Sequence, residues 1–292
     1  MKVGLFLMTY KGYRVLQSVI ESGFASHIGF VCIGKDANVG NDYSGEIEQC
    51  CLRHNIVSIE AKDAKQYAAT VDYSIAISWR WMLDPENLIV LHDSLLPKYR
   101  GFAPLVNMLK NGEARIGVTA IFAGDEYDKG DIIAQSGSDI SYPIKIEQAI
   151  ETVTANYIEV VEFIFETITA GKKLQGKAQI ESDATYSLWL DDRDYKIDWQ
   201  KDSGYIKRFI DAVGFPFHGA FSIVNDEKIV IREAETLGDV AIENRDVGKI
   251  IYFHEKFPVV VCGSGLLKIT DAVYDGTQES IFPLKKFRLR FE

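Results

Sequence analysis

The 292-residue chain lacks the features that mark membrane proteins, disulfide-rich proteins and metalloproteins. No apolar run approaches the roughly 20 residues of a membrane-spanning helix, so we expect no membrane partner. The four cysteines include the adjacent Cys50 and Cys51, whose spacing suits neither an ordinary disulfide nor a tetrahedral zinc site. The five histidines are scattered, with no metal-ligand cluster among them. These absences predict a cytoplasmic protein with reduced cysteines and no metal cofactor.

Positive charge is also in short supply. The chain carries 32 Lys and Arg against 42 Asp and Glu, a net charge of −10, and no segment is strongly basic. Because a nucleic-acid-binding protein normally presents a basic face, we expect no nucleic-acid partner. No Gly-x-Gly-x-x-Gly follows the first apolar run, which weakens a dinucleotide-binding interpretation. The loop found there contains Lys11 and Arg14, which either contact a phosphorylated substrate or are simply solvated.

What is present is an alternation of strand-like and helix-like segments. Strands are expected at 2–8, 28–33, 56–59, 73–77, 88–91 and 117–123, and helices at 13–22, 45–54 and 64–69. Residues 3–8 favour a core strand over a signal peptide, because no small-residue cleavage site follows. Apolar residues spaced by three and four predict a packing helix over 146–168. The pattern predicts an α/β fold with a doubly wound, mostly parallel sheet.

The last third of the chain has a different pattern. Residues 175–194 are polar and linker-like, and a helix is expected at 204–213. Short strands separated by turn residues are expected at 219–224, 228–233, 247–253, 259–262 and 266–273. Such a series is typical of a small β-barrel or sandwich. We therefore expect a catalytic domain over 1–190 and a smaller β-rich, barrel-like domain over 191–292.

Two loop segments, each of which follows an apolar run, contain the candidate catalytic residues. The first places His92 and Ser94 after an apolar run and continues into a loop rich in Pro and Gly. The second, residues 124–131, also follows an apolar run and is rich in Asp and Gly. A lone His at a strand end is more often structural, but two strand ends can place a base beside an orienting carboxylate. Ser94 is not flanked by the Gly-x-Ser-x-Gly pattern, so it is not expected to be a nucleophile; it either fixes the turn or contacts substrate.

These segments resemble the folate-dependent formyltransferase family. The matching motifs are His92-x-Ser-Leu-Leu-Pro-x-Tyr-Arg-Gly, Asn111-Gly-Glu, Gly117-Val-Thr, Asp128-x-Gly-Asp-Ile-Ile-Ala-Gln, Ile197-Asp-Trp and the segment 215–221. The resemblance implies a Rossmann-like catalytic domain that transfers a formyl group from 10-formyltetrahydrofolate to an amine. It implies that His92 and Asp128 are catalytic, His92 as the group titrating near neutral pH and Asp128 as its partner. It implies a folate site formed by Trp81, Met82, Leu83, Gly124, Asp125, Tyr127 and Asp128.

The chain departs from the family pattern at one position. The family has Asn-x-His, whereas Val90 precedes His92 here and offers no side-chain donor for an oxyanion. Removing such a donor typically lowers the rate by about 10²–10³-fold. Three explanations are open. Another donor compensates, namely a backbone N–H, a water or protonated His92; or the match of this segment to the family motif is displaced locally; or the protein is a slow or inactive transferase. We favour compensation, because the other motifs are retained together.

The family divides by acceptor. The acidic chain and the stretches 102–105, 186–189 and 197–199 resemble bacterial sugar N-formyltransferases rather than methionyl-tRNA formyltransferases. We expect a nucleotide-linked amino sugar as acceptor, a dTDP-amino-dideoxyhexose for surface polysaccharide or O-antigen. The alternatives are methionyl-tRNA and a noncatalytic folate or sugar-nucleotide binding role. Candidate substrate contacts are Lys11, Ser94, Lys98, Tyr99, Arg100, Phe102 and Pro104. For Arg100 the simpler alternative is that it only supports its loop. Tyr186, Trp189 and Trp199 either stack on a base or pack in a core. A homodimer is compatible with the sequence.

Overall fold

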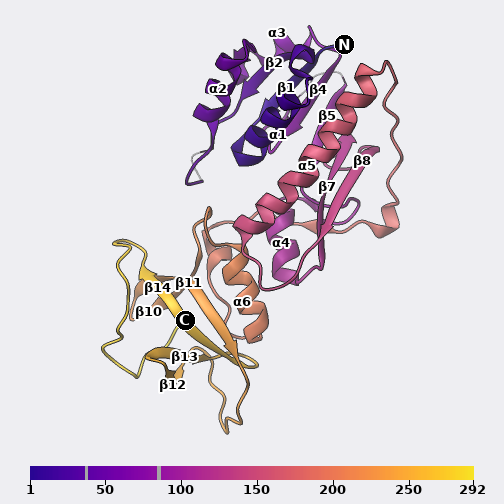
Figure 1. The fold of residues 1–292 in the computed structure, drawn as a ribbon. Helices are drawn as coiled ribbons and strands as arrows, with labels where there is room; N and C mark the ends of the chain where they lie inside the picture. The colour runs from indigo at the N-terminus through magenta and orange to yellow at the C-terminus, as the bar shows by residue number, and fades with distance from the viewer. Residues whose placement is uncertain (37–38, 84–86) are drawn as a thin grey trace. The chain divides into compact units, whose positions relative to one another are not determined.

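The computed structural model describes residues 1–36, 39–83 and 87–292 (Figure 1). The chain divides into two compact units. Unit 1 consists of Met1–Leu105, Ala114–Ile140 and Ala149–Leu188, and unit 2 of Val106–Glu113, Ser141–Gln148 and Trp189–Glu292. Two short segments from earlier in the chain thus belong to the same unit as the C-terminal region. No helix in the described part of the chain is long and apolar enough to cross a membrane.

A seven-stranded sheet with the order β3-β2-β1-β4-β5-β7-β8 forms the centre of unit 1. Its strands are β1 (Val3–Leu7), β2 (Ile28–Ile33), β3 (Ser58–Ile59), β4 (Tyr73–Ile77), β5 (Leu88–His92), β7 (Arg115–Phe122) and β8 (Ile132–Asp139). The strands from β3 to β5 run parallel, whereas β7 and β8 are each antiparallel to the preceding neighbour. All of β1 is buried, as expected for a strand covered on both faces. The predicted mostly parallel sheet is confirmed.

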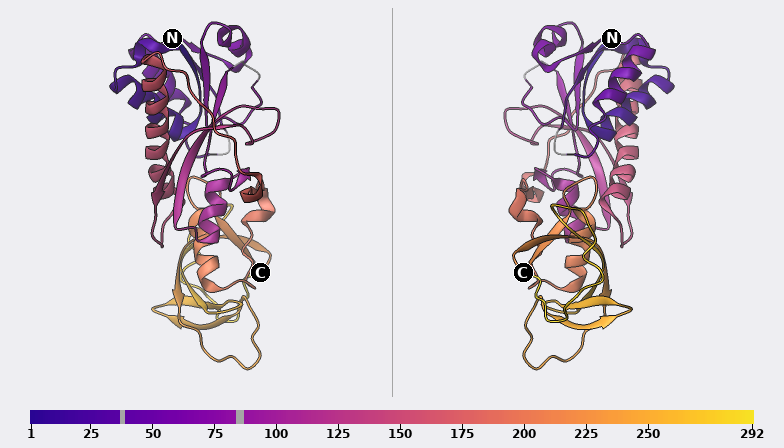
Figure 2. Two further views of the ribbon diagram at one scale, coloured as in Figure 1. Left: turned by 90° about the vertical axis from the view of Figure 1, so that its right-hand side faces the viewer. Right: turned by 90° about the vertical axis from the view of Figure 1, so that its left-hand side faces the viewer.

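Helices cover both faces of this sheet (Figure 2). Helices α1 (Thr9–Glu21), α2 (Ser44–Arg53) and α5 (Ile146–Thr169) lie on one face and α3 (Ala64–Ala68) on the other. Ser18 and Ser22 of α1 both donate hydrogen bonds to Glu162 of α5, at 2.5 and 2.7 Å. On the α3 face, a buried cluster includes Leu88, and Val90 packs against it. Because strand side chains alternate, β5 presents these two residues and His92 to the α3 face.

Unit 2 is built around a five-stranded antiparallel sheet with the order β10-β11-β14-β13-β12. Its strands are β10 (Ala220–Val224), β11 (Glu227–Leu237), β12 (Ile250–His254), β13 (Phe257–Val261) and β14 (Leu266–Tyr274). Helix α6 (Ser203–Ala212) contacts β11 and β14, and Asp202 caps its first turn by accepting a hydrogen bond from the Tyr205 N–H at 2.8 Å. The predicted β-rich C-terminal region is confirmed.

Three features were not predicted. Helix α4 (Pro104–Asn111) and strand β8 were missed, and so was a two-stranded ribbon in which β6 (Arg100–Gly101) pairs in parallel with β9 (Tyr186–Ser187). The ribbon corrects the interpretation of residues 175–194 as a linker. This polar segment returns to unit 1 and, as shown below, holds the loop that carries Asp128.

Candidate functional site

His92 is the last residue of β5, at the carboxyl end of the parallel strands where open α/β sheets place their ligand sites. The imidazole is largely buried, and both ring nitrogens have a neighbour. Nε2 lies 2.7 Å from the backbone carbonyl oxygen of Tyr99, and Nδ1 lies 3.4 Å from Oδ1 of Asp128. A carbonyl oxygen can only accept a hydrogen bond, so Nε2 carries a proton in this arrangement. Each ring nitrogen thus faces an oxygen that can accept a hydrogen bond, and these two contacts fix the orientation of the imidazole.

Asp128 reaches His92 by a route that the sequence did not predict. Two strand ends were expected at one edge of the sheet, but β7 runs antiparallel to β5, and Phe122 near its end pairs with Ile89. The following loop therefore has to turn back toward His92. Gly130 makes part of this turn, because a Cβ at that position would lie 1.7 Å from the Phe122 carbonyl oxygen. Oδ2 of Asp128 accepts a hydrogen bond from the Gly101 N–H at 2.8 Å, which fixes the carboxylate.

Gln179 holds the Asp128 loop from the other side, and sequence reasoning missed it. Its amide nitrogen donates to the carbonyl oxygens of Asp128 (2.7 Å) and Gly130 (2.8 Å). Its amide oxygen accepts from Nε and Nη2 of Arg100, at 3.1 and 2.9 Å. A polar side chain in a segment without periodicity gives no signal of such a role. One amide thus connects the orienting carboxylate to a buried guanidinium.

Of the two roles considered for Arg100, a substrate contact and support of its loop, the contacts of the side chain favour support. Its side chain is 1% exposed, and its Nη1 donates to both carboxylate oxygens of Glu181 at 3.0 and 2.8 Å. Burial alone would lower the pKa of this guanidinium, but hydrogen bonds to Glu181 and Tyr186 outweigh burial and raise the pKa. Arg100 therefore supports the β6–β9 ribbon, which is the plainer of the two roles considered.

Ser94 likewise serves the turn rather than a ligand. The residue is fully buried, and its Oγ donates to the Lys98 carbonyl oxygen at 2.6 Å. Thr119 of β7 secures the same turn, because its hydroxyl donates to the Ser94 carbonyl at 2.6 Å and accepts from the Leu96 N–H at 2.9 Å. Of the two roles considered for Ser94, fixing the turn and contacting substrate, these hydrogen bonds favour the turn. The hydroxyl instead shapes the backbone that presents the Tyr99 carbonyl to His92.

The other residues expected to contact the acceptor substrate differ in their exposure to solvent. Lys98 and Phe102 are exposed, Tyr99 is half-buried with a positive φ of 58°, and Pro104 is buried at the first position of α4. Lys98 and Phe102 are therefore accessible to a ligand, whereas Pro104 starts a helix, a position that favours proline.

The expected folate residues lie on two loops near His92. After β4, Trp81 and Met82 are exposed (51% and 76%), and Leu83 packs on the buried cluster of the α3 face. After β7, Gly124, Asp125 and Tyr127 are exposed. Large apolar side chains exposed together often mark ligand sites, and β4 and β7 are the two sheet neighbours of β5.

Lys11 is paired with an acidic side chain and is not simply solvated. Its ammonium lies 2.5 Å from Oδ2 of Asp93, the residue after His92, and 5.3 Å from the centre of the Tyr157 ring. The Tyr157 hydroxyl donates to Oδ1 of Asp93 at 2.5 Å. Burial alone would raise the pKa of Asp93, but the Lys11 charge and the two hydrogen bonds outweigh burial and lower it. Arg14, in contrast, is exposed and contacts the Tyr10 hydroxyl at 3.0 Å.

Val90 occupies the position where the family pattern has Asn. It is half-buried, lies on the same face of β5 as His92 and packs against the apolar cluster. The strand register pairs it with Ala76 and Ile121, with no irregularity in β5. Strand β5 is therefore regular at Val90.

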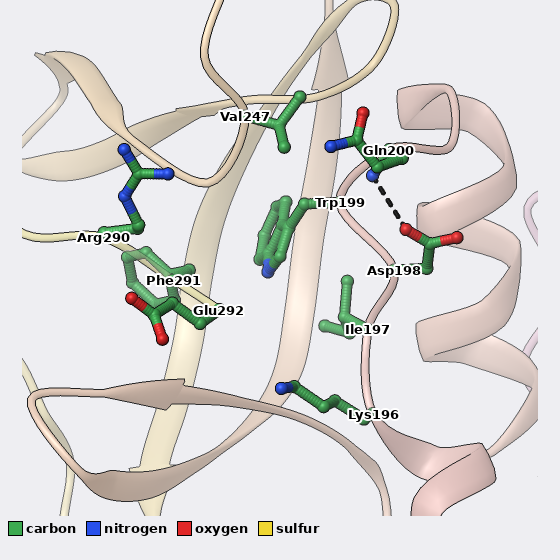
Figure 3. A pocket seen from close by; sticks show the side chains of 9 residues that line it. All are labelled: Lys196, Ile197, Asp198, Trp199, Gln200, Val247, Arg290, Phe291 and Glu292. Atoms are coloured by element: carbon green, nitrogen blue, oxygen red, sulfur yellow. Dashed lines mark hydrogen bonds between the residues drawn. The ribbon is translucent and has the colours of Figure 1, made fainter.

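A separate pocket of about 380 Å³ lies within unit 2 (Figure 3). It is lined by Lys196, Ile197, Asp198, Trp199, Gln200, Val247, Arg290, Phe291 and Glu292. Its polar groups are largely engaged: Asp198 accepts from the Gln200 N–H at 3.0 Å, and Arg290 pairs with Asp246. Trp199 is 4% exposed and donates to Ser222, so it is a core residue. Among the described residues of the whole chain, no group of three or more His, Cys, Asp or Glu could hold a metal ion.

Several known proteins are similar to this chain. A methionyl-tRNA formyltransferase from Marinobacter nauticus is 26% identical over 231 residues, covering 76% of this chain and 73% of the relative. One from Lactococcus lactis subsp. lactis is 33% identical over 181 residues, covering 61% of this chain and 55% of the relative. The chain thus spans little more than half the length of the more identical relative.

Solved structures share the fold at lower identity. The N-formyltransferase from Helicobacter canadensis, solved in complex with folinic acid and dTDP-3-aminofucose, has a TM-score of 0.69 at 16% identity, covering 92% of this chain and 99% of that chain. A variant of HypX from Aquifex aeolicus has a TM-score of 0.64 at 19% identity, covering 98% of this chain but 49% of that chain.

Two family descriptions match consecutive parts of the sequence. Residues 57–162 match "Formyl transferase", a range that contains both His92 and Asp128. Residues 190–280 match "Formyl transferase, C-terminal domain". Together the two matches cover more than half of the 292 residues. With its central site at the end of β5, its mostly parallel sheet and its β-rich C-terminal unit, the chain belongs to the formyltransferase family.

Proposed function

We propose that the protein transfers a formyl group from 10-formyltetrahydrofolate to the amino group of a nucleotide-linked amino sugar, a dTDP-amino-dideoxyhexose. The observation that carries this proposal is the His92–Asp128 pair. A largely buried imidazole ends β5, the last of the parallel strands, and a carboxylate fixed by the Gly101 N–H lies 3.4 Å from it. Family membership gives this pair its chemistry. The two-domain division at residue 190 and a role in O-antigen synthesis belong to the same proposal.

The proposed reaction needs a proton acceptor beside the amine. 10-Formyltetrahydrofolate supplies the formyl carbon and has its own nitrogen as the leaving group. As the acceptor nitrogen bonds to that carbon, His92 takes the proton that the nitrogen loses, and Asp128 stabilises the resulting imidazolium. His92 then returns the proton to the departing folate nitrogen. To take this proton at Nε2, the ring has to be neutral with its own proton on Nδ1, the nitrogen that faces Asp128, so substrate entry has to replace the contact between Nε2 and the Tyr99 carbonyl oxygen.

The residues present fit a folate. A flat, mostly apolar ring system needs apolar walls with a few polar groups between them. Trp81 and Met82 after β4 and Tyr127 after β7 are large exposed side chains that would supply such walls. Leu83, Gly124 and Asp125 complete the two loops, and Asp128 connects the second loop to His92.

The missing amide at Val90 is compensated by His92 itself in this proposal. An imidazolium is a charge-assisted donor, and such hydrogen bonds are roughly twice as strong as neutral ones. Once His92 has taken the acceptor proton, it can stabilise the oxyanion that forms on the formyl carbon. Protonated His92 then has two tasks, which makes its electrostatic surroundings more important than in an Asn-x-His site.

Three observations favour a sugar nucleotide as acceptor. The net charge of −10 disfavours transfer RNA, whose binding requires several phosphate contacts. The Helicobacter canadensis enzyme, similar over almost its whole length, binds a dTDP-amino sugar. Exposed Lys98 and Phe102 lie beside the site and would contact the nucleotide part. Methionyl-tRNA is the second candidate, because the curated relatives act on it.

An acceptor panel tests the proposal. The protein is mixed with 10-formyltetrahydrofolate and, separately, with dTDP- and UDP-linked amino sugars and methionyl-tRNA, and tetrahydrofolate release and product mass are followed. We expect turnover with a nucleotide-linked amino sugar and none with methionyl-tRNA. Turnover with the tRNA alone would replace the sugar assignment, and folate binding without any turnover would indicate a binding protein.

A further inference from the structure

The ribbon formed by β6 and β9 carries large side chains that unit 1 leaves exposed. The ribbon pairs Gly101 with Ser187, and the Phe102 N–H continues the pairing by donating to the Ser187 carbonyl oxygen at 3.0 Å. Phe102, Tyr186 and Leu188 are 56%, 60% and 74% exposed. Large apolar side chains that are exposed beside one another often mark a binding site. We call Phe102, Tyr186 and Leu188 the apolar platform.

The Tyr186 ring is held on its inner side by a buried guanidinium. The Arg100 side chain is 1% exposed, and its guanidinium carbon lies over the Tyr186 ring, 5.9 Å from the ring centre. Its Nη1 also donates to the Tyr186 hydroxyl at 3.3 Å. Arg100 is itself fixed by Gln179 and Glu181. An aromatic ring that is fixed on one side and exposed on the other is a preorganised surface for a second flat ring.

The apolar platform borders the His92–Asp128 pair through the backbone of the same loop. Tyr99, the residue before Arg100, places its carbonyl oxygen 2.7 Å from Nε2 of His92. Gly101, the residue after Arg100, donates its N–H to Asp128 at 2.8 Å. The two residues that flank Arg100 thus contact the two members of the pair. A substrate that reaches His92 therefore lies next to the platform.

The platform and the expected folate residues come from different segments. The expected folate residues follow β4 and β7, whereas β6 follows β5 and β9 comes after α5. This separation leaves the platform to the acceptor. In a nucleotide-linked amino sugar the diphosphate separates the sugar from the base, so a base can lie on the platform while the amine lies at His92. Exposed Lys98, on the β6 loop, suits the diphosphate between them.

We propose that the apolar platform is the base-binding subsite of the acceptor, with the nucleobase stacked on Tyr186 and flanked by Phe102 and Leu188. The inference rests on the proposed sugar-nucleotide acceptor and deepens it by naming the residues that hold the nucleotide part. Tyr186 is thus a specificity-determining residue, and Arg100 is a positioning residue that acts through Tyr186. Because stacking tolerates different bases, the platform should take thymine and uracil alike.

The test is a calorimetric titration of the full-length protein with dTDP, which carries the base and the diphosphate and needs no turnover. Tyr186→Leu keeps an apolar side chain but removes the ring, so the Kd for dTDP should rise about tenfold or more. Tyr186→Phe keeps the ring and loses only the hydroxyl contact, so the Kd should stay within about threefold of wild type. Inorganic pyrophosphate, which has no base, should bind wild type and Tyr186→Leu alike. Tyr252→Leu, at an exposed tyrosine of unit 2, is the matched control and should leave the Kd unchanged.

Steady-state formylation gives a second readout that separates base binding from a structural role. In Tyr186→Leu the KM for the nucleotide-linked amino sugar should rise about tenfold, while kcat and the KM for 10-formyltetrahydrofolate stay close to wild type, because the base is remote from the reacting atoms. A purely structural role of Tyr186 would instead lower kcat or the unfolding free energy and leave the KM for the sugar nucleotide unchanged.

Weaker dTDP binding by Tyr186→Leu, with binding retained in Tyr186→Phe, supports the inference. It is overturned if wild type does not bind dTDP, if Tyr186→Leu binds dTDP as wild type does, or if both variants lose binding equally. Weaker folate binding by Tyr186→Leu also overturns it, because the platform would then serve the co-substrate. If Tyr186→Leu does not fold, Phe102→Ala decides by the same comparison. A failure of the proposed function looks different: the wild-type protein would bind dTDP through Tyr186 but formylate no nucleotide-linked amino sugar.

Discussion

The clearest test of the site's construction is the removal of Gln179. Its amide makes four hydrogen bonds, two to the carbonyls of Asp128 and Gly130 and two from the guanidinium of Arg100. In Gln179→Ala both carbonyls lose a donor, and Arg100, at 1% exposed, keeps its contacts with Glu181 and Tyr186.

The expected loss can be estimated from these contacts. Neutral hydrogen bonds contribute about 0.5–1.5 kcal/mol each, and bonds to charged groups about 1.5–3 kcal/mol. Water partly replaces the lost partners, so we expect unit 1 to lose about 2–4 kcal/mol of unfolding free energy. We also expect kcat to fall about tenfold or more, because the loop that orients Asp128 is no longer fixed.

Gln179→Glu separates the two roles of the amide. Glutamate still accepts from Arg100, but it places an oxygen against the carbonyls of Asp128 and Gly130, so kcat should fall as in Gln179→Ala while the retained contact with Arg100 offsets part of the stability loss. Denaturant unfolding and steady-state formylation measure the two effects. Gln175→Ala, an exposed position in the same segment, is the matched control. Wild-type kcat in both Gln179 variants would refute the claim that this amide positions Asp128.

Three further substitutions test other contacts. Asp128→Asn keeps the shape but removes the charge facing His92, so kcat should fall by about 10²-fold or more, and a drop below threefold would leave Asp128 only structural. Val90→Asn places an amide beside an apolar cluster, so it should lower stability by about 1–3 kcal/mol without raising kcat, and a faster variant would show that the site lacks an oxyanion donor. Gly130→Ala would place a Cβ 1.7 Å from the Phe122 carbonyl oxygen, so the Asp128 loop should shift and formylation activity should drop sharply. Gly45→Ala, whose Cβ would enter open space, is the control and should leave unfolding and formylation unchanged.

Much of the fold could be predicted because unit 1 has strong periodicity. Strands β2 and β4 begin and end at the residues predicted for them, since their apolar runs are flanked by turn residues. Strand β8 was missed because five of its eight residues are Gln, Ser, Gly or Asp, and none of its residues is fully buried. The β6–β9 ribbon joins two-residue segments 86 positions apart, and pairing of that kind leaves no local pattern.

The candidate site was also predictable only where a local sequence pattern indicated it. His92 follows a recognisable strand, but Asp128 came from the family resemblance, because β7 proved antiparallel and the loop has to fold back. Arg100 and Ser94 were expected to face a substrate because a sequence gives residue type and not direction. Gln179, Asp93 and Tyr157 act through contacts between distant segments, which composition and spacing do not reveal.

The most direct test of the account compares wild-type protein with His92→Ala in one formyl-transfer assay, using 10-formyltetrahydrofolate and the acceptor that the panel identifies. Circular dichroism and folate binding confirm that both proteins are folded. The account predicts that the variant binds folate but loses at least about 10²-fold in kcat, because the imidazole that takes the proton is gone. Near-wild-type turnover by folded His92→Ala would contradict the assignment of His92 as the proton acceptor.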